Sequence, residues 1–103
     1  MTHVFSLDKP DTVILTGTDG NVIVGDTIVL ECSSTGGHPI PTVAMSRSGT
    51  ILTSGLTSPQ KVTVNVVEGD DGATYNCDTT NTEGQLQTFV TLQVSCECLS
   101  SGF

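Results

Sequence analysis

The chain has 103 residues and a net charge of −8, with only three basic residues against eleven acidic ones. This length is typical of a single domain with one core. A surface this acidic repels phosphate groups, which excludes nucleic acid and anionic lipid surfaces as partners. No apolar run approaches the roughly 18 residues that a membrane-spanning helix needs, so we expect no direct membrane insertion of this segment.

Apolar and polar residues alternate with period 2 through most of the chain, a pattern that predicts strands and no helix. Clusters of Gly, Asp, Asn and Ser separate the strands, as turns require. Pro10 is tolerated in the first strand because that strand is expected at a sheet edge, whereas residues 50–60 carry mixed signals. In chain order, the predicted strands are 10–16, 22–24 (pairing with the last strand), 27–33, 42–47, 61–67, 73–80 and 85–95.

Two of these strands carry a cysteine on the same face as their other core-type residues. Leu30 and Cys32 share one face of the third strand, and Tyr75 and Cys77 share one face of the sixth. Asp71 stands at the turn that enters the sixth strand. Two strands that each present a cysteine inward are typical of a sandwich with a disulfide across its core.

The segment Asp71-Gly-Ala-Thr-Tyr75-Asn-Cys77, with Asn81 and Gly84 after it, resembles the last two strands of an immunoglobulin-like domain of the I-set or C2-like kind. Residues 25–32 resemble an earlier strand of that family, and residues 37–41 resemble the loop after it. The resemblance extends over about residues 22–94, and the order and separation of the motifs make it specific.

The resemblance implies an all-β fold, a two-sheet antiparallel immunoglobulin-like sandwich of about 7–8 strands with one inter-sheet disulfide, Cys32 to Cys77. It also implies a tyrosine-corner role for Tyr75, whose hydroxyl is expected to bond the backbone of the preceding turn. Asp71 is expected to pair with a basic residue or to cap the turn. The family usually has a tryptophan on strand 42–47, but this chain has none, so we expect Met45 to fill that place less completely.

The resemblance further implies an extracellular recognition or adhesion module of a cell-surface receptor, adhesion molecule or secreted immune-type protein. Its partner would be another protein, and a homophilic dimer is one expectation. The alternative is a structural spacer without a ligand. The cysteines indicate an oxidising compartment and disfavour the intracellular muscle-type domains of the family, which need no cystine.

We expect no enzyme activity, metal or cofactor. The acidic run 68–71 is too short for a calcium loop, and His3 and His38 lack cysteines at zinc spacing. No serine, cysteine or threonine stands in a recognisable nucleophile motif with a histidine and a carboxylate.

Strict alternation along the last strand turns Phe89 outward, because Val90, Leu92 and Val94 face the core. An aromatic anchor within a polar rim is typical of protein interfaces. The other interpretation is a lone exposed aromatic or a contact with a neighbouring domain. The chain has no Asn-x-Ser/Thr sequon, so no N-glycan shields this face. The expected partner-binding residues are Phe89, Gln87, Thr91, Asn76, Asp78, Ala44 and Ser46.

Residues 1–9 are interpreted as a lead-in or linker, residues 10–95 as the domain, and residues 96–103 as a tail or the start of a next module. Cys96 and Cys98 are too close in sequence to bond each other, since their Cβ atoms would be roughly 7 Å apart in an extended chain. Three interpretations stay open: partners in a next module, interchain bonds, or an exposed free thiol.

Overall fold

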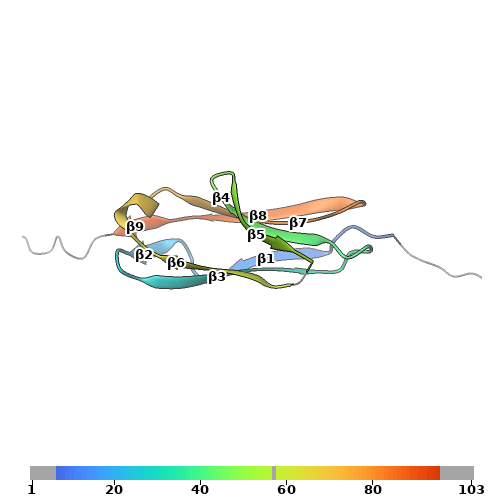
Figure 1. The fold of residues 1–103 in the computed structure, drawn as a ribbon, viewed down its shortest axis with the longest axis horizontal. Coiled ribbons are helices and arrows are strands. Elements are labelled where there is room, and N and C mark those ends of the chain that lie inside the picture. The colour runs from blue at the N-terminus through green and yellow to red at the C-terminus, as the bar shows by residue number, and fades with distance from the viewer. Residues whose placement is uncertain (1–6, 57, 96–103) are drawn as a thin grey trace, which may run out of the picture.

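The computed structural model describes residues 7–56 and 58–95. Within them, strands form two layers that lie face to face, with one short 3-10 helix, η1 (Glu68–Asp70), at one end (Figure 1). One layer has the strand order β1-β3-β6, the other has the order β5-β4-β7-β8, and β2 pairs with β9. The strands are β1 (Thr12–Thr16), β2 (Asn21–Ile23), β3 (Thr27–Thr35), β4 (Thr42–Arg47), β5 (Thr50–Gly55), β6 (Gln60–Asn65), β7 (Thr74–Asn81), β8 (Gly84–Thr91) and β9 (Gln93–Ser95).

This architecture confirms the predicted all-β sandwich with one inter-sheet disulfide. The sulfur atoms of Cys32 on β3 and Cys77 on β7 are bonded, and the Cα atoms are 5.5 Å apart. Because β3 and β7 belong to different layers, the bond ties the two sheets together. Both cysteines are fully buried.

The first segment crosses from one layer to the other between β1 and β2. β1 pairs with β3 at the edge of its sheet, whereas β2 pairs in parallel with β9, with Val22 opposite Val94. Gly17 makes the crossing possible: its φ is +122°, and a Cβ there would collide with the carbonyl oxygen of Val29. The predicted pairing of residues 22–24 with the last strand is therefore confirmed.

The last predicted strand, 85–95, is two strands in the structure. β8 pairs with β7 as far as Thr91, and β9 pairs with β2. Leu92 lies between them, donates its N–H to the carbonyl of Ala73 and is fully buried. The interruption marks the residue at which the chain changes its pairing partner.

The stretch 50–60, which the sequence left uncertain, forms β5 and the beginning of β6. β5 pairs with β4, with a register irregularity between Met45 and Ser46, so it belongs to the four-stranded layer. In the described part of the chain, β6 therefore has β3 as its only strand neighbour.

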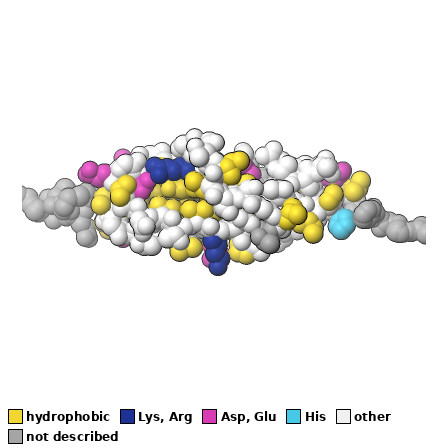
Figure 2. Space-filling model, viewed as in Figure 1, with side chains coloured by type: hydrophobic (Ala, Val, Ile, Leu, Met, Phe, Trp, Pro, Cys, Tyr) yellow, Lys and Arg dark blue, Asp and Glu magenta, His cyan; other side chains and the backbone are white. Residues whose placement is uncertain are grey.

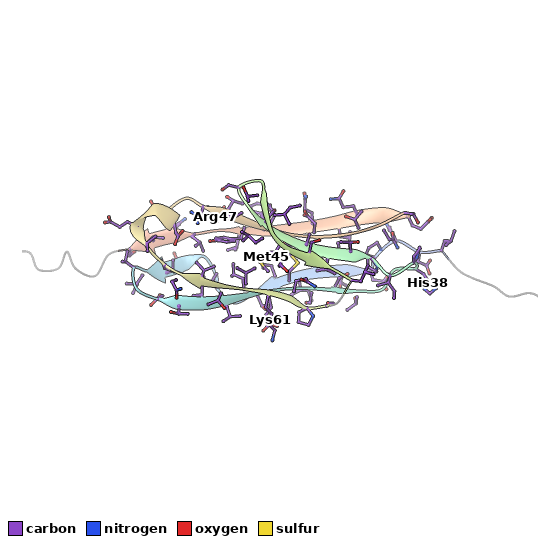
Figure 3. The ribbon with its side chains drawn as sticks, viewed as in Figure 1. His38, Met45, Arg47 and Lys61 are labelled. Carbon is purple, nitrogen blue, oxygen red and sulfur yellow. A yellow bond between two sulfur atoms is a disulfide. The ribbon has the colours of Figure 1, made fainter. Side chains whose placement is uncertain are left out.

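The core lies between the layers and is centred on the disulfide. Met45 is completely buried, directly opposite Cys77 on the neighbouring strand, and points into the space between the sheets (Figure 3). Leu30, Tyr75 and Leu92 are also buried there. Met45 thus occupies the interior next to the disulfide, where the family usually has a tryptophan.

Candidate functional site

The outward face of the four-stranded layer carries every residue that the sequence assigned to partner binding. Alternation along β8 leaves the Phe89 side chain 64% exposed, while Leu92 is fully buried. Gln87 and Thr91 are also exposed on β8, and the β4 and β7 members of the set are partly buried.

The strand register brings these residues into rows across the sheet. Phe89 lies opposite Asn76, Asn76 opposite Ser46, and Ser46 opposite Ile51 on β5. In the next row, Gln87 lies opposite Asp78 and Asp78 opposite Ala44. A third row contains Thr91 and Thr74, whose hydroxyl groups are hydrogen-bonded to each other at 3.0 Å. The predicted residues therefore form one continuous surface, which we call the Phe89 face: the outward residues Ala44, Ser46, Ile51, Thr74, Asn76, Asp78, Gln87, Phe89 and Thr91.

Two members of this face, Ile51 and Thr74, were not predicted from the sequence, and Ile51 is the apolar one. Its side chain is 67% exposed, and it ends the row that begins at Phe89. In the sequence, Ile51 is an isoleucine that follows a turn. The local pattern of residues 50–55 does not indicate which layer they join. With Ile51 included, the face has an aromatic side chain on one edge strand and an aliphatic one on the other.

Charge is scarce on this face. Asp78 is its one ionisable residue, and its Oδ1 atom is buried without a hydrogen-bond partner among the described residues. The neighbours Ala44 and Gln87 carry no charge. A partner that covers the face has to desolvate few charges, which lowers the cost of association.

Next to the face, a partly exposed arginine at the end of β4 forms an electrostatic cluster with a buried carboxylate. The Arg47 guanidinium contacts the Asp70 carboxylate at 2.9 Å and lies over the Tyr75 ring, 5.8 Å from its centroid. The other Asp70 oxygen accepts the Val67 N–H at 3.0 Å. Asp70 is buried although it is charged, because both of its oxygens have partners.

Asp71 does not form the ion pair that the family resemblance suggested. Its side chain points toward β9, where its Oδ1 atom accepts the N–H of Val94 at 2.9 Å. The ion pair belongs to the preceding residue, Asp70, because η1 turns that side chain inward toward Arg47. Asp71 therefore fixes the turn to β9 instead of bridging the sheets.

We expect Asp70→Asn to lower the free energy of unfolding by about 1–2 kcal/mol, because it removes a charge-assisted bond from a buried carboxylate whose partner is partly solvated. Asp71→Asn is the matched control on an exposed neighbour and should cost about half as much. Urea unfolding of both variants measures the difference. Equal losses would contradict the assignment of the ion pair to Asp70.

Tyr75 lies against this cluster, and the hydrogen bonds among the described residues do not include the predicted one from its hydroxyl to the turn. Burial raises the pKa of the Tyr75 phenol above its ordinary value of 10.0, and the nearby Arg47 acts in the opposite direction. Since the folded pKa is the higher one, stability is complete below pH 10 and falls as the pH rises through the folded pKa.

The alkaline titration of Tyr75 is directly measurable, because the chain has one tyrosine and no tryptophan. We expect the phenolate absorbance of the folded domain to appear with a midpoint above pH 10. Arg47→Gln should move the midpoint higher still, since it removes the cation that favours phenolate. A midpoint below that of the unfolded chain would show that Tyr75 is not buried as described.

Cys96 and Cys98 lie outside the described residues. Within residues 7–56 and 58–95, no three or more His, Cys, Asp or Glu side chains are grouped to hold a metal ion. The same residues contain no helix long and apolar enough to cross a membrane.

Comparison with known proteins gives one family and many similar folds. Residues 9–95 match the family model of the immunoglobulin domain. No curated protein matches the chain. Among solved structures, a chimeric titin Z1Z2 carrying a decorin peptide has a TM-score of 0.69 and 24% identity, covering 90% of this chain and 100% of that one.

Two further structures are similar. The structure of Sidekick-1 immunoglobulin domains 1–5 has a TM-score of 0.66 and 25% identity, over 89% of this chain and 21% of that one. The complex of titin M10 with obscurin-like 1 Ig has a TM-score of 0.63 and 18% identity, over 86% of this chain and 97% of that one.

Proposed function

The chain belongs to the immunoglobulin domain family, and we propose that it is an extracellular protein-recognition module, one domain of a cell-surface or secreted adhesion or immune-type protein. It binds through the Phe89 face, without chemistry and without a cofactor. The disulfide supports an oxidising location, where such bonds persist.

The observation that carries this proposal is the exposure of Phe89 within a surface of low charge. An aromatic side chain left 64% in water costs solvation free energy that burial against a partner recovers. The flanking residues Asn76, Gln87 and Thr91 provide a polar rim, as at the centre of protein interfaces. One four-stranded sheet forms the whole face.

A second copy of the domain fits this face. A two-fold axis that lies above the middle of the row from Phe89 to Ile51, parallel to the strands, places each Phe89 over the Ile51 of the other copy. A symmetric dimer needs such self-complementarity. Each copy brings one ionisable residue, Asp78, into such an interface, although each copy carries a net charge of −8. Titin M10 with obscurin-like 1 Ig is a complex among the similar structures.

Phe89→Ala tests the proposal. We expect association to weaken at least about thirtyfold, which is the loss of an aromatic anchor worth about 2 kcal/mol, while the melting temperature barely changes. Ile14→Ala is the matched control, because Ile14 is a 49% exposed apolar residue on β1, in the other layer. Sedimentation and thermal melting are measured on the same samples.

A variant that loses stability but keeps association would place Phe89 in the core. A variant that keeps both would mean that the domain binds elsewhere or is a spacer. The spacer function has one observation in its favour: Ile40 and Leu56 are both more than 60% exposed and line one hollow at the end of the sandwich. Residue Asp8 of the lead-in is bonded to His38 in the loop beside it, so a preceding domain could pack there.

A further inference from the structure

The strand β6 has an open edge. It pairs with β3 on one side, and no other strand of residues 7–56 and 58–95 pairs with its second side. In an antiparallel ladder, alternate residues direct their N–H and C=O groups away from the neighbouring strand. Along β6 these groups face outward, as a template for one more strand.

A groove follows this edge. The hydroxyl of Thr53 on β5 is hydrogen-bonded to Gln60 at the beginning of β6, at 2.6 Å. Beyond that contact the two strands diverge (Figure 1), and a hollow of ≈ 360 Å³ opens between the layers. Four consecutive residues of β6, 62–65, line this hollow, so it runs along the strand. Leu52 and Tyr75 contribute apolar surface to it.

Two basic residues of this acidic protein lie at or beside the groove, although Asp70, which also lines it, offsets the charge of Arg47. Of the three basic residues in the sequence, Lys61 lies on β6 and Arg47 lines the groove. Figure 2 shows these two basic patches on either side of an apolar hollow, and Figure 3 places the labelled Arg47 and Lys61 on opposite layers. Arg47 is paired with Asp70 but keeps 38% of its side chain exposed. Lys61 is exposed, with Glu31 as its cross-strand neighbour.

We propose that the β6 edge is a second recognition site, which takes an extended segment of a partner protein as an added strand. The segment bonds the backbone of β6, places alternate apolar side chains in the groove, and carries a carboxylate that meets Lys61. The net charge of −8 repels acidic chains elsewhere on the surface, whereas Lys61 attracts a carboxylate at this edge, and Arg47 is already paired with Asp70.

A partner segment fits this edge better than a second copy of the domain does. Two β6 edges paired with each other would bring two Lys61 side chains to one seam, where like charges oppose association, whereas each Arg47 is already paired with Asp70. The site shares no residue with the Phe89 face, although Arg47, Leu52 and Tyr75 of the four-stranded layer also line the groove.

The probe is a short blocked peptide that alternates valine and threonine and carries one aspartate, added to the ¹⁵N-labelled chain. We expect amide shift changes along β6 and slower hydrogen exchange of its outward N–H groups. Two control peptides should each bind at least about tenfold more weakly. One is N-methylated at the amides that would bond β6, so it loses the added strand's hydrogen bonds. The other has lysine in place of aspartate, and its charge repels Lys61.

Matched variants locate the effect. Lys61→Gln and Lys9→Gln change the net charge equally, but only Lys61→Gln should weaken peptide binding, by about threefold as for an exposed ion pair. Leu52→Ala should weaken it, whereas Ile14→Ala and Phe89→Ala should not. The proposal is overturned if millimolar peptide causes no shifts, if the shifts map to the Phe89 face, or if the N-methylated peptide binds equally well.

Discussion

Replacing Cys32 and Cys77 together with alanine is expected to lower the free energy of unfolding by about 4 kcal/mol. The bond closes a loop with a sequence separation of 45, and a cross-link of that span removes roughly this much chain entropy from the unfolded state. A domain of this size has a net stability of about 5–10 kcal/mol, so the bond supplies a large share of it. Both residues are changed at once so that no thiol is left unpaired in the core.

Urea and thermal unfolding of the double variant, compared with the oxidised wild type, measure this loss. The reduced wild type is the control and should fall by a similar amount. A loss below about 1 kcal/mol would contradict the structural role of the bond. Peptide mapping without reductant should recover Cys32 linked to Cys77, and a link from Cys32 to Cys96 or Cys98 would contradict the pairing.

Met45→Ala has the next largest expected effect on stability, a loss of about 2–4 kcal/mol. Met45 is fully buried opposite Cys77, so the change removes apolar contacts beside the disulfide and leaves a cavity between the layers. The surrounding sheets are pinned by that disulfide and can close the cavity only in part.

Met45→Leu is the volume-conserving control and should cost less than about 1.5 kcal/mol. Both variants are measured by urea unfolding at the same pH. A loss below about 0.5 kcal/mol for Met45→Ala would place the side chain at the surface, and it would exchange the inward and outward residues of β4.

The side of the sheet to which individual residues point could be predicted from the sequence. Period 2 is a local property of an extended chain, so it placed Cys32 and Cys77 inside and Phe89 outside without any knowledge of neighbouring strands. The family resemblance placed Met45 inside. The structure gives these four residues the same sides. The inter-sheet disulfide was predicted in the same way, with the family resemblance supplying the partner.

Features that depend on long-range pairing could not be predicted. The sequence of residues 50–55 does not indicate whether they pair with β4 or with β6. That pairing decides both the position of Ile51 and whether β6 has an open edge. The sequence left open whether Asp71 pairs with a basic residue or caps the turn, because Asp70 and Asp71 are adjacent and the single turn η1 decides which one points inward. One turn of helix is too short to leave a periodic signal.

The most direct test of recognition through the Phe89 face is a map of amide chemical shifts of the ¹⁵N-labelled domain, recorded from micromolar to millimolar concentration. We expect concentration-dependent shifts at outward residues of β4, β5, β7 and β8, centred on the row from Phe89 to Ile51, and unchanged signals from β1, β3 and β6. A spectrum that does not change with concentration, or shifts confined to β1, β3 and β6, would contradict self-association through this face.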